Sequence, residues 1–443
     1  MASDHATQPV PILGTDGERR EPARSTARLL VAGTSRRPDA QLAEIEARIA
    51  RWLGRFALAS NDTAGLLAGF AGQLVALGLP LMRVAAGSQV FHPLYAAKVY
   101  YWRRDLGVER EDFARDVPGH DGWETSPFRQ MVSTGAAELR RTLGSSYHRG
   151  EFPLLDRLVR EGCTDYLAFR IGFAPEATLG QIPGVLVSFQ TDRAGGFTEA
   201  EADLARALAL HYAHAYKTLS SVHAGRVLMR TYLGADPSRR VLDGAIARGQ
   251  AETVQAVLWY SDLEGFTRIA DTAAPDALIG LLNAYADCLV TIIAEHRGEV
   301  LKFMGDGILA MFPLGDDSPC ARALDAAEAA LGAVDRLARE RAAEGLPCTG
   351  IHLALHVGEV LYGNIGSRER LDFTVVGPAV NEVARIEAMC RQLEQRVVTS
   401  TAFAQAAGEA RSRLVSLGRY ALRGVRRPEE LFTIDPESGD AAH

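Results

Sequence analysis

The sequence predicts an α/β protein with two domains, each combining strands and helices. Its 443 residues are 47% hydrophobic, which is enough for two or three cores at roughly 100–200 residues per domain. Runs rich in Val, Tyr and Phe alternate with helical patterns along the chain, and such runs predict strands packed against helices. Because only 23% of the residues are charged and 19 are proline, a mostly disordered chain is excluded.

The composition also narrows the class of function. A net charge of −7 and a pI near 5.9 argue against a general nucleic-acid binder, which would normally be basic. Five widely spaced cysteines without a CxxC pair predict reduced thiols and give neither a disulfide framework nor a zinc site. The N-terminus is polar and carries acids, unlike a signal peptide. We therefore expect a cytoplasmic protein with no nucleic-acid partner.

The N-terminal half is expected to begin with a flexible tail, residues 1–40, and to continue as helices and strands. Residues 41–59 place five apolar side chains on one helical face. The uncharged stretch Ala64–Met82 approaches the length of a membrane span, but four glycines and Pro80 favour a buried helix that runs into a strand. No membrane span is therefore expected. Residues 105–160 are polar and are expected to be irregular. Strands are expected at MRVAAGSQVFHP, LYAAKVYYWR, DYLAFRIGF and GVLVSFQTD.

A long helix is expected after these strands. Thr198 and Glu201 form a Thr-x-x-Glu capping box at its start. Residues then recur at alternating steps of three and four, a stripe narrow enough to pair with the same helix of a second chain. The stripe consists of Leu204, Leu208, His211, Ala215, Leu219 and Val222. Residues 221–250 are expected to form an ordered coupling linker. The succession of elements over residues 41–220 resembles a GAF-like sensor domain, whose input would be an unknown small molecule or protein.

The C-terminal half carries residues suited to phosphate chemistry. Val254–Tyr260 is a strand by composition, and Asp262 follows at its end, before a turn with glycine and the start of a helix. Backbone amides in that turn can bind phosphate oxygens while Asp262 binds their cation. The turn consists of Leu263, Glu264, Gly265, Phe266 and Thr267. The alternative is that Asp262 only caps the next helix.

A second aspartate occupies a predicted hairpin, which follows a helix expected over Asp276–His296. The strand Glu299–Phe303 turns at Met304–Gly307 and returns, which exposes Asp306 at the tip. Two aspartates at adjacent strand ends, each with a glycine nearby, suit two Mg²⁺ or Mn²⁺ ions about 4 Å apart. Taken alone, Asp306 would be an ordinary turn residue.

Asn381 and Arg385 form a third candidate group. The strand His352–Val357 and the strand LDFTVVG precede a predicted helix, Pro378–Cys390, with proline near its first turn. Asn381 and Arg385 are four residues apart and share one face of that helix. An amide and a guanidinium that project together can fix a ribose and a phosphate. An ordinary solvated helix face is the alternative.

These residues lie in motifs that resemble a known family. YSDLEGFT, KFMGDGILAMF, GEVLYGNIGS and DFTVVGPAVNEVAR look like the successive motifs of the class III nucleotidyl cyclase catalytic domain, over roughly residues 251–435. Residues 436–443 would be a tail. The resemblance implies a ferredoxin-like α/β domain that is active as a homodimer with its active sites at the interface.

The resemblance also implies a role for each candidate residue. Asp262 and Asp306 would be ligands of two metal ions. Asn381 would orient the ribose, and Arg385 would stabilise the transition state as the ribose 3′-oxygen attacks the α-phosphorus and pyrophosphate leaves.

Lys302 and Thr374 stand where the family reads the purine base. A lysine ammonium can donate to adenine N1, and a threonine hydroxyl can accept from the exocyclic amine. Guanine would present N1–H to Lys302, donor against donor, which is costly in a closed site. We therefore expect an adenylate cyclase that converts ATP to 3′,5′-cyclic AMP under the control of the N-terminal domain. A guanylate cyclase and a nucleotide-binding signalling module without turnover are the alternatives.

Overall fold

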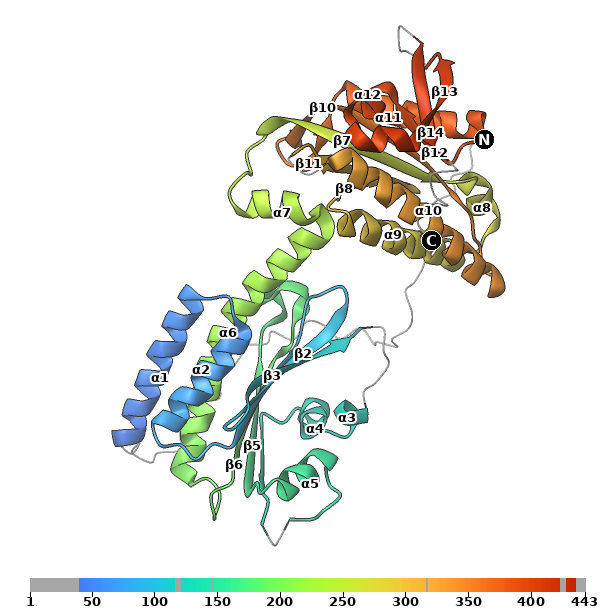
Figure 1. Ribbon diagram of the computed structural model, residues 1–443. Coiled ribbons are helices and arrows are strands. Elements are labelled where there is room, and N and C mark those ends of the chain that lie inside the picture. Colours follow the sequence, from blue (N-terminus) through green and yellow to red (C-terminus); the bar gives the residue numbers. More distant parts are fainter. Residues whose placement is uncertain (1–39, 116–120, 145–146, 316–317, 423–427, 436–443) are drawn as a thin grey trace, which may run out of the picture.

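The computed structural model has two lobes, each built on its own β-sheet (Figure 1). It describes residues 40–115, 121–144, 147–315, 318–422 and 428–435. The expected tails therefore lie outside the described residues, except that Ala40 already belongs to the first helix.

The N-terminal lobe contains a six-stranded antiparallel sheet with the order β3-β2-β1-β6-β5-β4. Its strands are β1 (Arg83–Gln89), β2 (Tyr95–Arg103), β3 (Gly107–Ala114), β4 (Glu138–Thr142), β5 (Asp165–Gly172) and β6 (Gly184–Thr191). The four strands predicted from Val-, Tyr- and Phe-rich runs are β1, β2, β5 and β6, and they are the four central strands of the sheet, between the edge strands β3 and β4.

Helices cover both faces of this sheet (Figure 1). The larger core lies under three helices, α1 (Ala40–Ala59), α2 (Thr63–Ala76) and α6 (Glu199–Leu233). The smaller core lies on the other face. Its surroundings include α3 (Asp121–Glu124), α4 (Pro127–Thr134) and α5 (Pro153–Arg160), with short 3₁₀ turns at Pro175–Ala177 and Leu179–Gln181 elsewhere in the lobe. The identification of this lobe as GAF-like stays a prediction.

The expectation that residues 105–160 are irregular was wrong. This segment contains β3, β4, α4 and α5. β3 has the sequence GVEREDFA and lies at an edge of the sheet, with exposed and partly exposed side chains throughout. An edge strand whose side chains all stay at least partly exposed needs no strict hydrophobic alternation, so the pattern used to find strands is missing there.

The apolar stretch Ala64–Met82 is a buried helix followed by a strand, as predicted. α2 ends at Ala76, and Leu66, Phe70 and Leu74 are fully buried in the larger core. Among the described residues, one helix is long and apolar enough to cross a membrane, namely α9 (Pro275–Glu295) of the C-terminal lobe. The apolar side chains that α9 buries in the core of its own lobe are Leu281, Tyr285, Leu289 and Ile293.

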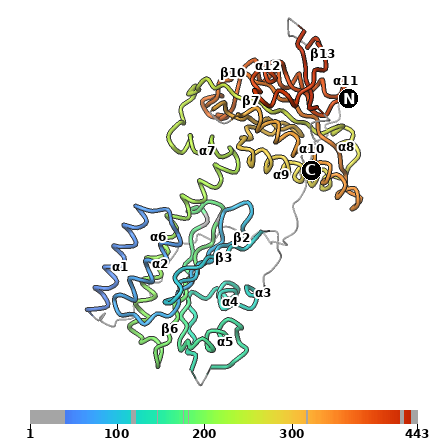
Figure 2. Tube along the Cα trace, viewed as in Figure 1, coloured from blue at the N-terminus to red at the C-terminus, as the bar shows by residue number. Residues whose placement is uncertain are grey.

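Helix α6 begins at the predicted capping box and is longer than expected. The Thr198 hydroxyl accepts from the Glu201 N–H, and the Glu201 carboxylate accepts from the Thr198 N–H at 2.8 Å. The helix continues to Leu233 and is followed by α7 (Ala235–Leu242), so the predicted coupling linker, residues 221–250, begins within α6 and is largely helical up to Leu242. Figures 1 and 2 show α6 leaving the N-terminal lobe and reaching α7 beside the C-terminal lobe.

The prediction that the stripe on α6 pairs with the same helix of a second chain was also wrong. Leu204, Leu208 and Leu219 are at most 4% exposed, because they pack into the core of their own lobe. A side chain buried in its own domain cannot also form a seam with a second helix. Only Val222, at 44% exposure, is an exposed apolar member of the stripe.

The C-terminal lobe contains an eight-stranded sheet with the path β13-β14-β12-β10-β7-β9-β8, and β11 pairs with β10 beside this path. Its pairs are antiparallel except β10–β12. The strands are β7 (Ala251–Leu263), β8 (Glu299–Met304), β9 (Gly307–Pro313), β10 (Ile351–Gly366), β11 (Leu371–Val376), β12 (Val397–Ser400), β13 (Leu414–Tyr420) and β14 (Glu429–Ile434).

Alternation along the strands divides the core of this lobe into two. On β7, Val257 and Trp259 point to the core that contains α9 and α10 (Pro319–Ala343), whereas Ala256 and Leu258 point to the core under α11 (Pro378–Leu393). The other helical segments are α8 (Phe266–Thr272), α12 (Thr401–Ala406) and the 3₁₀ segment Gly408–Arg413. All five cysteines are free, as predicted.

Candidate active site

Asp262 and Asp306 lie together at one end of the central strands. Asp262 is the penultimate residue of β7, and Asp306 lies in the turn between β8 and β9, as predicted for the hairpin. β7 pairs with β9 so that Ser261 faces Ile308, which brings the two aspartates side by side. A Cβ placed on Gly307 would come within 3.0 Å of the Tyr260 hydroxyl and 3.2 Å of Met304 O, so a larger residue would crowd the turn beside Asp262.

The proximity of the two carboxyl groups has an electrostatic consequence. Burial, and then the neighbouring Asp306, raises the pKa of Asp262 to about 7. Two carboxylates in such contact cannot both ionise cheaply unless a cation lies between them. Their oxygen atoms are the ligands that Mg²⁺ and Mn²⁺ prefer, so the residues present fit a divalent metal site.

Two residues that the sequence analysis missed complete the surroundings of this pair. Glu387 on α11 adds negative charge that also raises the pKa of Asp262. The Glu387 carboxylate lies 4.0 Å from His352 Nδ1 on β10, and burial lowers the pKa of that imidazole. The helical period of the buried residues Val383, Ile386 and Cys390 would have placed Glu387 on the inward face of α11.

The predicted phosphate-binding turn follows β7 directly. Gly265 has φ +65° and precedes α8, so the chain turns there through a backbone conformation that favours glycine. The Glu264 N–H donates to Gly350 O at 3.0 Å, which ties the turn to the segment before β10. Leu263 is only 5% exposed and Phe266 packs partly against the core, so their side chains face inward, while Thr267 is exposed. Backbone groups, rather than these apolar side chains, are what the turn can offer to a ligand.

Lys302 has a partner that the sequence analysis did not assign. Its Nζ lies 3.3 Å from Asp372 Oδ2 on β11, and both side chains are about half exposed. Thr374, the expected partner, is two residues further along β11 and therefore on the same face of the strand. A carboxylate attracts an ammonium more strongly than a hydroxyl does, which explains the pairing with Asp372. The strand alternation of LDFTVV was the available signal for Asp372.

Asn381 and Arg385 lie on the solvent side of α11. Both residues are exposed, one helical turn apart, and within the described part of the chain neither side chain has a hydrogen-bond or ion-pair partner. The structure therefore brings Asp262 together with Asp306, and Lys302 together with the strand that bears Thr374. It leaves Asn381 and Arg385 on an open surface.

A cleft of about 250 Å³ opens beside the hairpin. It lies between α9 and the β8–β9 turn, where Asp306 contributes to its wall. The rest of its lining includes Leu263, Leu282, Asn283, Phe303 and Gly305. Asp306 is thus reachable from the side of the sheet that carries α9.

The sequence of this lobe matches that of known catalytic domains. Residues 250–436 match the family model of the adenylate and guanylate cyclase catalytic domain. The chain is 29% identical over 207 residues to an adenylate cyclase of Anabaena cylindrica, covering 46% of this chain and 40% of that protein. It is 28% identical over 174 residues to adenylate cyclase 1 of Rhizobium meliloti, covering 39% of this chain and 26% of that protein.

A solved structure, the guanylyl cyclase Cya2, is similar at 28% identity with a TM-score of 0.38, covering 42% of this chain and 93% of that one. The chain thus spans less than half the length of the curated relatives it matches. Cyclase domains of this class generally depend on divalent metal ions. The motif order, the paired aspartates and the family match agree: residues 250–436 form a class III nucleotidyl cyclase catalytic domain and belong to the adenylate and guanylate cyclase family.

Proposed function

We propose that this chain is an adenylate cyclase that converts ATP to 3′,5′-cyclic AMP and pyrophosphate. The observation that carries the proposal is the contact between Asp262 and Asp306 at the end of β7, inside a cyclase catalytic domain. A half-buried acid whose pKa rises to about 7 next to a second acid marks a place built for positive charge.

Two divalent ions, Mg²⁺ or Mn²⁺, would be held by Asp262 and Asp306. Such ions lower the pKa of a bound ribose 3′-hydroxyl and neutralise the triphosphate. The chain's own contribution is to fix both carboxylates on neighbouring strands. The turn from Leu263 to Thr267 offers backbone amides at the start of α8 for the phosphate oxygens.

The polarity of the base site supports ATP over GTP. Lys302 can donate to adenine N1, while the carboxylate of Asp372 or the hydroxyl of Thr374 accepts from the adenine amine. Guanine would set its N1–H against the Lys302 ammonium and its O6 against the Asp372 carboxylate. Lys302 and Asp372 are about half exposed, and once a bound base covers them both mismatches would leave polar groups unpaired, which discriminates strongly between substrates.

Asn381 and Arg385 would act in a homodimer. They are exposed on α11 and have no side-chain partner among the described residues, so a partner subunit can approach them. By the family resemblance, Asn381 orients the ribose and Arg385 stabilises charge on the transferred phosphoryl group of ATP held by the aspartates of the partner. A two-fold symmetric dimer repeats each contact, so one interface closes two sites.

The N-terminal lobe would regulate the catalytic lobe through α6 and α7. Asp236 at the start of α7 is the centre of the junction, since its N–H donates to Glu299 Oε1 at 2.7 Å on β8. Tyr362 of β10 donates its hydroxyl to Asp236 Oδ2 at 3.1 Å, and Arg240 pairs with the same carboxylate. These contacts tie α7, which follows α6 directly, to two strands of the catalytic sheet. With ATP as substrate and free thiols, we place the protein in the cytoplasm.

The test compares ATP and GTP as substrates for the purified full-length chain in Mg²⁺ and in Mn²⁺, with products identified by mass spectrometry. We expect cyclic AMP as the main product and no turnover after chelation of metal ions. A preference for GTP would overturn the assignment of adenine as the base that Lys302 reads. The absence of either cyclic nucleotide under all conditions would overturn the proposal.

The dimer is tested separately by mixing Asp306→Ala and Arg385→Ala chains. Each variant alone should be nearly inactive, because it spoils both sites. Mixed dimers keep one intact site, so activity should return to about a quarter of wild type when half of the dimers are mixed. No recovery on mixing would place each site within one chain.

A further inference from the structure

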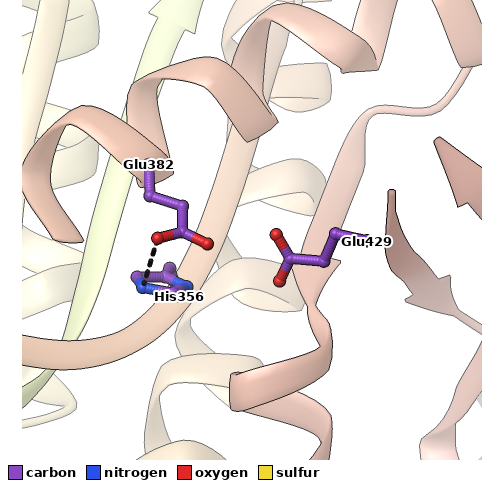
Figure 3. Close-up of side chains that lie close together, drawn as sticks. All are labelled: His356, Glu382 and Glu429. Atoms are coloured by element: carbon purple, nitrogen blue, oxygen red, sulfur yellow. Dashed lines mark ion pairs between the residues drawn. The ribbon is translucent and has the colours of Figure 1, made fainter. Parts of the chain in front are cut away.

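A second cluster of potential ligand atoms lies on the α11 side of the catalytic sheet. His356 on β10, Glu382 on α11 and Glu429 at the start of β14 each offer one nitrogen or oxygen, and these atoms all lie within 4.8 Å of one another. Figure 3 shows the imidazole and both carboxylates turned toward a common centre. Among the described residues, no other group of three or more histidines, cysteines or acids has its ligand atoms this close together.

The imidazole of His356 is oriented as a metal ligand would be. The residue is 5% exposed, and its Nδ1 is 2.9 Å from Ser400 Oγ. Ser400 Oγ already accepts from the Phe403 N–H at 3.0 Å and has a second lone pair for a proton on Nδ1. In that tautomer the lone pair of Nε2 is free. The Nε2 atom faces Glu382 Oε2 at 3.8 Å, too far for a hydrogen bond.

Neither carboxylate has a lysine or arginine partner in the part of the chain that the structure describes. Glu429 Oε2 is buried and, among the described residues, has no hydrogen-bond partner. Burial, and then the neighbouring Glu382, raises the pKa of Glu429 to about 7. An unsatisfied buried carboxylate oxygen beside a second carboxylate is costly unless a proton or a cation lies between them.

We propose that His356, Glu382 and Glu429 bind a divalent transition-metal ion, for which Zn²⁺ is the probe. Ligands about 2.1 Å from a tetrahedral ion lie about 3.4 Å apart, so small side-chain movements convert the present spacing into coordination. One imidazole with two carboxylates suits Zn²⁺ better than Mg²⁺, which favours oxygen ligands alone. The Ser400 hydroxyl would hold the imidazole from its other nitrogen, as such groups do for metal-bound histidines.

This site is distinct from the aspartate pair and does not depend on the proposed function. His356 lies four residues along β10 from His352, the residue paired with Asp262, which is a separation of about 13 Å along a strand. Its consequence concerns α11. Glu382 follows Asn381 and precedes Arg385 by less than one turn, so an ion bound there would tie the exposed residues of α11 to β10 and β14.

The experiment measures Zn²⁺ binding by the full-length chain in which Asp262→Asn and Asp306→Asn remove the other metal site. After chelation and dialysis against Zn²⁺, metal analysis should show one Zn²⁺ per chain. Adding Glu429→Gln, which keeps the size of the side chain, should weaken binding at least about tenfold, and His356→Gln should do the same. Glu430→Gln is the matched control, because that carboxylate is the next along β14 and bonds to Ser416 instead.

Two results would overturn the proposal. One is a chain without the aspartates that binds no Zn²⁺ at any soluble concentration, which would mean that the two glutamates share only a proton. The other is equal Zn²⁺ affinity with and without Glu429→Gln. If a variant fails to fold, Co²⁺ added to the wild-type chain in saturating Mg²⁺ gives a second reading. We expect the intense visible absorption of four-coordinate Co²⁺, and only the weak absorption of octahedral Co²⁺ would contradict it.

Discussion

Two carboxylates at the ends of strands, one in each lobe, have opposite surroundings. Asp165 of β5 is fully buried and accepts from the Tyr166 and Phe197 N–H groups, both at 3.0 Å, and from Arg140 Nη2 at 2.8 Å. Asp262 of β7 is partly buried, and its nearest charged neighbour is another acid, Asp306. The first carboxylate is satisfied by the chain itself and the second is not.

The comparison distinguishes a carboxylate that stabilises the fold from one that serves a ligand. Asp165 joins β5 and β4 to the segment that enters α6, so its hydrogen bonds hold the N-terminal lobe together. Asp262 and the cluster around Glu429 each place carboxylates close together, which lowers the stability of the fold unless a cation binds between them. Such a loss of stability is expected at functional sites. Variants at the two kinds of carboxylate should therefore fail in opposite ways, one in stability and one in activity.

The largest effect is expected from Asp306→Asn. It removes one negative ligand without changing the size of the side chain, so turnover of ATP in Mg²⁺ should fall at least about a hundredfold. The free energy of unfolding should stay the same or rise, because repulsion with Asp262 is relieved. Steady-state kinetics and urea unfolding measure the two quantities. Asp271→Asn on exposed α8 is the control, and near wild-type turnover of Asp306→Asn would refute a metal role.

The converse variant is Arg140→Ala in the N-terminal lobe. It leaves Asp165 buried without its counter-charge, which should lower the free energy of unfolding by about 3 kcal/mol. Arg141→Ala removes a more exposed pair with Glu151 from the neighbouring position and should cost less than about 1 kcal/mol. Urea titration of both variants provides the measurement. Equal losses would mean that burial of Asp165 does not set the cost.

A smaller effect is expected at the base site, where the structure and the motif comparison differ. Asp372→Ala should lower ATP turnover about tenfold, the scale of one hydrogen bond to a charged group. Thr374→Ala should have less effect if Asp372 is the acceptor for the adenine amine. Parallel assays with ATP and GTP distinguish the two residues. A larger loss of ATP turnover from Thr374→Ala than from Asp372→Ala would restore Thr374 as the partner of Lys302.

The smallest effect concerns pH and the junction between the lobes. Burial raises the pKa of Glu299 above its ordinary value of 4.5, so the folded chain holds this proton to higher pH than the unfolded chain does. Its contribution to stability is therefore complete below pH 4.5 and declines as the pH rises. Since the group is partly exposed, the decline should be below about 1 kcal/mol. Glu299→Gln should be favoured over wild type more at pH 8 than at pH 5 in urea unfolding, and a constant difference would contradict this.

Sequence reasoning succeeded where a residue's position in a motif coincides with its position on an element. The hairpin that carries Asp306 turns at its two glycines, as predicted. The helix that carries Asn381 begins at Pro378, also as predicted. It missed residues whose role depends on contacts between elements that are far apart in the sequence. Asp372 meets Lys302 across two strands far apart in sequence, and Glu387 reaches the aspartates only because α11 lies over β7.

The N-terminal lobe was less predictable for a different reason. Its central strands are buried and apolar, and they were found, but the edge strand β3 and the short strand β4 carry charged side chains in contact with solvent. The stripe on α6 shows the same limit, since periodicity identifies a buried face without identifying what buries it. Leu208 packs inside its own lobe, although its spacing fits a helix pair equally well.

The geometry of helix α6 would allow it to transmit a movement from one lobe to the other. Its 35 residues extend about 52 Å, and the part from Thr198 to Ala224 is clamped in the core of the N-terminal lobe. The remaining nine residues form an arm of about 14 Å that ends at Leu233, next to the junction at Asp236. A tilt of about 10° at the clamp would move the end of that arm by about 2 Å, comparable to the helix shifts that switch other proteins. Repacking a few side chains around the clamp would thus be enough to displace β8, the strand on which Lys302 lies.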